Sequence, residues 1–160
     1  MNRFKWVPLH IRAPFPPKPA DNRMAIFWLA REGDRHGGAL WFVNESHEVL
    51  DYIKVSTDSS LTVDETQNGV ATEIGKYRIF KQVLVGEAIQ IEKFDGYYDL
   101  DYCFSVTVEI NAPKYPKTIL QTDITKGGVH ETVLLWNTGE SGKTIGYKVN
   151  GCNLQHSRRE

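Results

Sequence analysis

A short acidic segment rich in tyrosine is the first stretch of this sequence whose residue types could bind a ligand. Three carboxylates fall within seven residues, and two tyrosines stand between the first and the second of them. Carboxylate oxygens are ligands that calcium prefers, although this spacing is not that of an EF-hand. Exposed tyrosines are also effective anchors at protein interfaces. The candidate binding residues are Asp95, Tyr97, Tyr98, Asp99 and Asp101.

The same segment has a second interpretation that needs no ligand. Asp residues in loops between strands often accept hydrogen bonds from nearby backbone groups, which fixes the turn. The sequence leaves both interpretations open.

Other groups that could do chemistry are dispersed along the chain. Only one histidine, His156, lies within four residues of another histidine or a cysteine (Cys152), and a zinc site requires two such pairs. Serine, cysteine, histidine and aspartate are all present, but without a nucleophile-elbow pattern such as G-x-S-x-G. We therefore predict no metal, no cofactor and no catalytic residue. The histidines are His10, His36, His47, His130 and His156.

Three of these histidines fall in expected loops and could still meet at one end of the fold. A pocket that brought His36, His47 or His130 beside Asp99 or Asp101 would indicate an enzyme or a small-ligand binder. Such a site is assembled from separate loops and has no signature in the linear sequence.

Residues 137–144, Asn-Thr-Gly-Glu-Ser-Gly-Lys-Thr, resemble the phosphate-binding loop of nucleotide-hydrolysing proteins, with Asn137 in place of the first glycine. That loop turns a strand into a helix, so that backbone amides and the lysine converge on phosphate. Here the residues after Lys143 alternate as a strand, and only 16 residues follow Thr144. We expect a hairpin loop that joins a strand at 132–136 to a strand at 144–149.

Length, composition and charge exclude several classes of protein. The 160 residues suit one domain, and 41% apolar with 24% charged residues is the balance of a globular chain. Nineteen basic and twenty acidic residues give a net charge of -1, so no overall field favours nucleic acid or an anionic membrane. No apolar run approaches the roughly 18 residues of a membrane span. Pro8, His10 and Arg12 interrupt any signal peptide. With only two cysteines, we expect a cytoplasmic protein with reduced thiols.

Alternation of apolar and polar residues predicts strands. The clearest strand is 102–110, where Tyr102, Phe104, Val106, Val108 and Ile110 share one face. Similar alternation occurs at 77–84, 88–94 and 144–149, and Ile53 and Val55 alternate with polar neighbours.

Two further segments, 24–30 and 39–43, are apolar nearly throughout. This is typical of strands that are covered on both faces, and the glycines between the segments indicate a hairpin with a long loop. If one sandwich cannot bury both segments, they would favour a self-associating structural subunit.

Turn residues at short intervals divide the chain into about nine strands with little helix, which predicts an antiparallel β-sandwich. Only 61–76 is ambiguous, as a long loop or a short helical turn. We expect one sandwich domain over 24–152 and a frayed tail over 153–160. Residues 1–23 should form an extended proline-rich segment, whose P-x-x-P pattern at 14–19 suits either an aromatic groove or a strap across its own domain.

The stretch 40–46, followed by Leu50, Ile53 and Val55, resembles the strand–turn–strand opening of immunoglobulin-like sandwiches, and the resemblance covers about 40–110. It implies that Trp41 packs centrally and that Tyr102 forms a corner with the preceding loop. Phe104 stands where antibody domains carry their second cysteine, so an antibody-type domain is not implied.

These observations favour a non-catalytic module that binds a protein partner through loop or edge residues. The alternatives are a small-ligand binder or enzyme with a site built from loops, and a self-associating subunit. Fold class alone does not choose among them.

Overall fold

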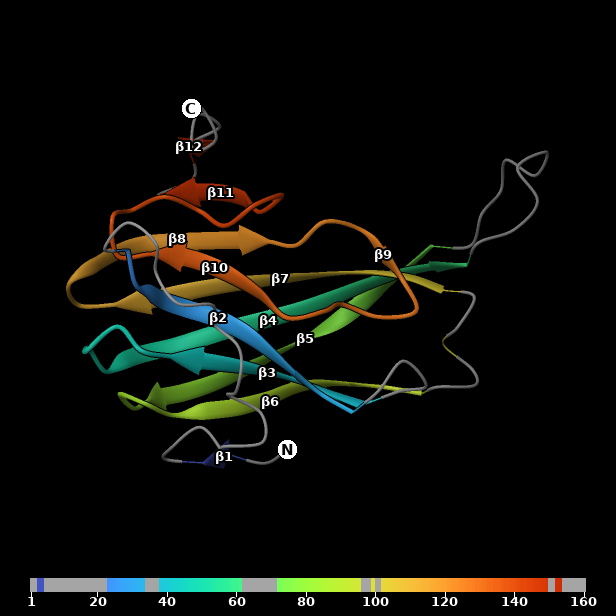
Figure 1. Cartoon of the computed structure of the whole chain (residues 1–160), viewed down its shortest axis with the longest axis horizontal. Coiled ribbons are helices and arrows are strands. Elements are labelled where there is room, and N and C mark those ends of the chain that lie inside the picture. The colour runs from blue at the N-terminus through green and yellow to red at the C-terminus, as the bar shows by residue number, and fades with distance from the viewer. Residues whose placement is uncertain are drawn as a thin grey trace.

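The computed structural model describes residues 3–4, 23–33, 38–61, 72–95, 99, 102–149 and 152–153. These residues form two antiparallel sheets and no helix, and the sheets pack face to face (Figure 1). The expected all-β antiparallel sandwich is confirmed. Of the twelve strands described, three contain only two residues, which leaves nine longer strands. No helix in the described residues has the length and apolarity needed to cross a membrane.

The first sheet, sheet A, has five strands. The expected hairpin of apolar strands lies at its centre as β2 and β3. The two strands pair antiparallel, with Phe27 opposite Asn44 at one end and Glu32 opposite Ala39 at the other. In spatial order its strands are β1 (Arg3–Phe4), β6 (Ala88–Phe94), β3 (Gly38–Asn44), β2 (Ala25–Glu32) and β10 (Thr132–Trp136).

The second sheet, sheet B, has seven strands. Its centre is formed by β7 and β4, which pair along ten residues. In spatial order its strands are β12 (Cys152–Asn153), β11 (Gly146–Val149), β8 (Tyr115–Gln121), β7 (Tyr102–Ala112), β4 (Leu50–Leu61) and β5 (Thr72–Val83), with β9 (Thr125–Lys126) paired to β7.

Segment 137–145 does not join a hairpin, so this prediction was wrong. It carries the chain from β10 in sheet A to β11 in sheet B. Gly142 N donates to Leu134 O (3.0 Å), so the segment first folds back along β10. Ile145 is then buried in the central core, and β11 pairs with the edge of β8. The burial of Ile145 and the pairing of β11 with β8 place the end of the segment in sheet B, so the chain does not continue along β10.

The central core lies between the sheets and follows the predicted alternation. On β7, Phe104, Val106, Val108 and Ile110 are buried there, and Tyr102 packs against the same core. Ile53 and Val55 of β4 also point inward, as expected.

A second buried cluster lies on the face of sheet A that points away from sheet B, and we call it the outer cluster. Side chains on a strand alternate between its faces, so Leu40 and Phe42 enter the central core while Trp41 does not. The central position that the resemblance implied for Trp41 was therefore wrong. The expectation that 24–30 and 39–43 would be covered on both faces is confirmed for residues 25–30 and 39–43 except Ile26, which is only partly buried. It was wrong for Met24, which is 59% exposed. The outer cluster contains Ala25, Trp28, Ala30, Ala39, Trp41, Val43, Ala88 and Val133, with Trp136 packed against it.

The predicted boundaries at the two ends of the chain fall largely outside the described residues. Within the N-terminal segment, Arg3–Phe4 form β1 and pair with β6. At the other end, Cys152–Asn153 pair with β11. In the ambiguous region, Leu61 ends β4 and 72–76 belong to β5. Residues 5–22, 62–71 and 154–160 lie outside the described ranges.

Candidate functional site

Only two of the five candidate residues in the acidic segment can be placed. Asp95 and Asp99 are described, whereas Tyr97, Tyr98 and Asp101 lie outside the described residues. Asp95 N donates to Asp99 Oδ2 (2.6 Å), Asp99 N donates to Asp95 O (3.1 Å) and Tyr102 N donates to Asp99 O (3.1 Å). Asp99 therefore bonds to its own loop, which is the second of the two interpretations open at the sequence level.

This loop leaves sheet A after Phe94 and enters sheet B at Tyr102, and an aromatic cluster lies where it is anchored. The rings of Phe94 and Phe104 are 4.9 Å apart, and Tyr102 is 6.3 Å from Phe104. The Arg31 guanidinium lies over Phe94, 4.9 Å from the ring centre, and Nη1 donates to Val129 O (2.8 Å). Both ends of the loop are thus fixed to the sandwich.

The histidines do not gather at one end. His47 follows β3 after Asn44, whereas His130 is next to Val129, which Arg31 contacts near the start of β3. Seven residues of β3 span roughly 20 Å between these two ends. His47 and His130 therefore do not meet, and His36 lies outside the described residues. Among the residues that the structure describes, no three His, Cys, Asp or Glu side chains form a group that could hold a metal ion.

The segment that resembles a phosphate-binding loop has a structural role instead. Lys143 is exposed and β11 follows it where a helix would be required. Asn137 Oδ1 accepts from Met24 N (3.0 Å), and Asn137 N donates to Met24 O (2.8 Å), which holds the start of β2. A Cβ at Gly142 would lie 1.7 Å from Val133 O, so only glycine fits this close approach.

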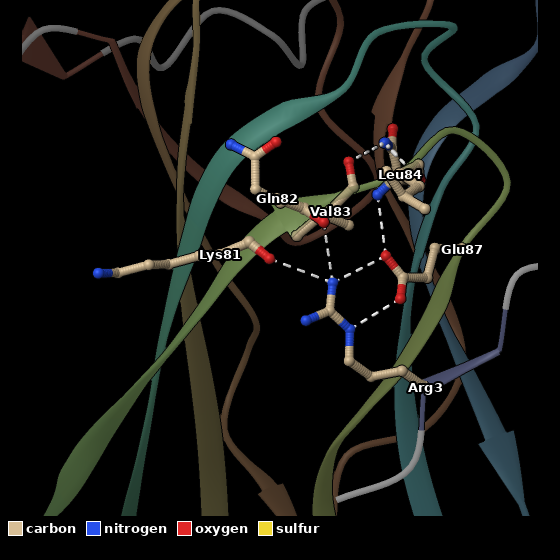
Figure 2. A network of polar contacts seen from close by, with 7 residues as sticks. Arg3, Lys81, Gln82, Val83, Leu84 and Glu87 are labelled. Atoms are coloured by element: carbon tan, nitrogen blue, oxygen red, sulfur yellow. Dashed lines mark hydrogen bonds and ion pairs between the residues drawn. The ribbon is translucent and has the colours of Figure 1, made fainter.

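A network around Arg3 joins the edges of the two sheets (Figure 2). Arg3 Nε donates to Glu87 Oε2 (2.7 Å) and Nη2 donates to Glu87 Oε1 (2.8 Å). The same Nη2 reaches the backbone carbonyls of Lys81 (3.2 Å) and Gln82 (3.0 Å), and Glu87 Oε1 accepts from Leu84 N (2.8 Å). We call this network the Arg3 clamp. It ties β1 of sheet A to the end of β5 in sheet B.

Asn44 completes the same end of the sandwich from a fully buried position. Its Nδ2 donates to the carbonyls of Glu48 (2.9 Å), Leu84 (3.1 Å) and Val83 (3.3 Å). Its Oδ1 accepts from Ser46 N (3.1 Å) and Ser46 Oγ (2.6 Å). One side chain thus holds the turn after β3 against the turn after β5.

Strand β5 presents an open edge. Among the described strands only β4 pairs with it, and it ends the order of sheet B. Arg3 Nη2 donates to the Lys81 carbonyl. Since Arg3 belongs to β1 and not to β4, we infer from this bond that the carbonyl points away from β4. Backbone groups two residues apart in an antiparallel strand point the same way, so those of Ile79 and Tyr77 also face outward.

The side chains of β5 alternate between an exposed face and a face that points into the sandwich. Tyr77 is 59% exposed and Ile79 is 48% exposed, and Lys54 Nζ lies 4.2 Å from the centre of the Tyr77 ring. Arg78 points inward, where Nη2 bonds to the carbonyl of Ile91 and lies 3.3 Å from Glu92 Oε2 on β6. The edge therefore combines open backbone groups with two exposed apolar side chains.

Sequence reasoning placed a strand at 77–84 but could not show that it lies at an edge. Alternation indicates which face a residue occupies, whereas strand order depends on contacts distant in sequence. The exposed apolar residues Tyr77 and Ile79 within an alternating strand are the one signal that could have indicated this site.

Compared with known protein families, curated proteins and solved structures, the chain matches none of them.

Proposed function

We propose that this protein is a non-catalytic interaction module that binds an extended segment of a protein partner along the edge of β5. The observation that carries the proposal is the outward-facing backbone of Tyr77 and Ile79, flanked by their exposed side chains. An added strand would form main-chain hydrogen bonds with this edge, while alternate side chains of the partner contact Tyr77 and Ile79.

The Arg3 clamp limits where such a strand could lie. Arg3 Nη2 already bonds to the Lys81 and Gln82 carbonyls, so this end of the edge is closed. The open part is Thr72–Phe80. A long edge strand without protection invites pairing with any chain, and a clamp that covers one end restricts both length and register.

The order of connections supports the finer proposal of an immunoglobulin-like topology for β2–β8. The chain crosses between the sheets from β3 to β4 and again from β6 to β7, and the ladders β3·β6 and β4·β7 lie at the centres of the two sheets. Immunoglobulin domains have the same two central pairs, formed by strands B with E and C with F. On this proposal β8 corresponds to strand G, and β10 and β11 are additions.

A cytoplasmic location is part of the proposal. Its support is the scarcity of cysteine, with Cys103 present as a free thiol. The described core is apolar and continuous between the sheets, so the sheets do not depend on a disulfide to hold them together. The fold therefore needs no oxidising compartment.

The edge can be tested with two proline substitutions that differ by one residue. Ile79→Pro removes an outward-facing N–H, which edge strands tolerate, whereas Arg78→Pro removes an N–H that pairs with β4. We expect Ile79→Pro to fold and to lose binding, and Arg78→Pro to be strongly destabilised. Thermal unfolding followed by circular dichroism checks the first part.

Binding is then measured by capture of a stoichiometric partner from an extract of the native host. Capture by the wild type and by Tyr97→Ala with Tyr98→Ala, but not by Ile79→Pro, supports the β5 edge. The reverse result would assign binding to the loop 95–101, and no stoichiometric partner at all would count against an interaction module. Wild-type dimers in sedimentation velocity that Ile79→Pro abolishes would instead identify a self-associating subunit.

A further inference from the structure

Two lysines at the open edge of β5 form no ion pair with any residue that the structure describes. Lys54 of β4 lies opposite Ile79, and Lys81 follows Ile79 by two residues on β5. Opposite residues, and residues two apart on one strand, share a face of the sheet. All three side chains therefore lie on the outer face of sheet B. Lys81 is exposed, and its side chain points away from the Arg3 clamp (Figure 2).

The two arginines on the same side of the sandwich are, in contrast, each neutralised within the chain. Arg3 Nε lies 2.7 Å from Glu87 Oε2, and Arg78 Nη2 lies 3.3 Å from Glu92 Oε2. The positive charge left for a partner at this edge is therefore that of the two lysines. It is a local charge, since the whole chain has a net charge of -1.

The Lys54 side chain is directed toward the edge. Its Nζ lies 4.2 Å from the centre of the Tyr77 ring, so the side chain crosses from β4 over β5. A strand added to β5 would place one residue opposite Ile79, on the side to which Lys54 extends. The same residue would be a diagonal neighbour of Lys81, at a separation that long side chains span. An acidic side chain at this one position would therefore meet both ammonium groups.

The charge changes sign along the edge. Asp58 lies opposite Ile74, nearer the start of β5, and it forms no ion pair with a described residue. It shares the outer face with Lys54, because the two residues are separated by an even number of positions on β4. The edge therefore attracts a negative charge opposite Ile79 and repels one opposite Ile74.

On the basis of the proposed function, we infer that the partner segment carries an acidic residue opposite Ile79 and an apolar residue opposite Tyr77. The described pairs in sheet B are all antiparallel, and an added antiparallel strand would have its N-terminal end near Ile79. The motif then reads acidic, any residue, apolar from the N-terminus of the partner.

The observations favour a polypeptide over an anionic nucleic acid. Only a polypeptide offers main-chain N–H and C=O groups that continue the ladder at Tyr77 and Ile79. A base stacked on Tyr77 would also compete with Lys54, which already lies over that ring.

NMR titration of the full chain with synthetic peptides tests this motif. The acidic peptide is Thr-Glu-Thr-Val-Thr-Val-Thr, the reverse peptide has the same residues in the opposite order, and the neutral peptide has Gln in place of Glu. We expect the acidic peptide to shift the amides of Tyr77 and Ile79 and to bind about three- to tenfold more tightly than the neutral peptide. The reverse peptide should bind no more tightly than the neutral one, because its Glu falls near Asp58. Salt should reduce the acidic preference.

A pair of variants assigns the preference to the two lysines. Lys54→Gln with Lys81→Gln should remove the difference between the acidic and the neutral peptide, while circular dichroism retains the β signal. The matched control is Lys117→Gln on β8, because the Lys117 ammonium is already 3.5 Å from Glu109 Oε2. This control should keep the preference.

Equal binding of the acidic and the neutral peptide at Tyr77 and Ile79, or tighter binding of the reverse peptide, would overturn the motif and leave binding at the β5 edge intact. The motif is also overturned by a preference that survives in the double lysine variant, or by single-stranded DNA that shifts the Tyr77 amide more than the acidic peptide does at equal concentration. If no peptide shifts Tyr77 or Ile79, both the motif and the proposed function are wrong.

Discussion

Removal of the Arg3 clamp should destabilise the fold by an amount that its geometry determines. The Glu87 side chain is 8% exposed and the Arg3 side chain is 34% exposed, with two short charged hydrogen bonds between them. Hydrogen bonds to charged groups contribute about 1.5–3 kcal/mol each, and partial exposure of Arg3 reduces this value. We expect Arg3→Ala to lower the free energy of unfolding by about 2 kcal/mol. Glu87→Ala should lower it by slightly more, because Leu84 N also loses its acceptor.

A double-mutant cycle isolates the pair from these other contacts. Urea unfolding of the wild type, both single variants and Arg3→Ala with Glu87→Ala should give a coupling energy of about 1–2 kcal/mol. The matched control is Lys114 with Glu48, whose atoms are 3.7 Å apart and whose lysine side chain is 75% exposed. Exposed pairs of this kind couple by less than about 0.5 kcal/mol. A clamp coupling no larger than the control value would refute the argument that Arg3 joins the two sheets.

Three further changes test the contacts that shape the rest of the fold. Asn44→Ala removes every hydrogen bond of a fully buried amide and should destabilise the protein by about 2–4 kcal/mol in urea unfolding; a change below that of an exposed substitution would contradict its role. Gly142→Ala places a Cβ 1.7 Å from Val133 O and should lower the melting temperature sharply, whereas Gly146→Ala, with its nearest contact at 3.7 Å, should have a much smaller effect in calorimetry. Burial raises the pKa of Tyr147 above its ordinary 10.0, so above pH 10.0 the unfolded chain loses this proton first and stability falls as pH rises through the folded pKa; Tyr147→Phe should reduce that fall in unfolding measured from pH 9 to 12, and an unchanged slope would speak against it.

Alternation was sufficient to predict the fold class and the inward faces of individual strands. On β7 the apolar residues from Phe104 to Ile110 all enter the central core. The two apolar runs at 24–30 and 39–43 indicated cover on both faces, because alternation leaves no polar face in either. Such patterns depend on local geometry, which a sequence shows directly.

Contacts between distant residues could not be predicted in the same way. Arg3 and Glu87 are 84 residues apart, and no spacing rule connects them. Trp41 was assigned to the wrong face because every residue of the run 39–43 is apolar, so the sequence does not show which of them point toward the central core. The crossing at 137–145 was mistaken for a hairpin because turn residues indicate that the chain reverses, and not which sheet it enters next.

The acidic segment shows a further limit. Its residue types suit calcium, a protein interface or a self-bonded loop, and the described bonds of Asp99 to Asp95 and Tyr102 are those of a self-bonded loop. The β5 edge, in contrast, has ordinary residue types and becomes a candidate site only through its position in sheet B.

Amide hydrogen exchange on β5, followed by NMR in the free and the partner-bound protein, tests the proposed function most directly. In the free protein, the amides of Tyr77 and Ile79 should exchange rapidly, while those of Arg78 and Phe80 are protected by pairing with β4. On binding, Tyr77 and Ile79 should become protected, and Asp95 and Asp99 should not change. Protection that appears at the loop 95–101 while Tyr77 and Ile79 stay in rapid exchange would contradict binding at the β5 edge.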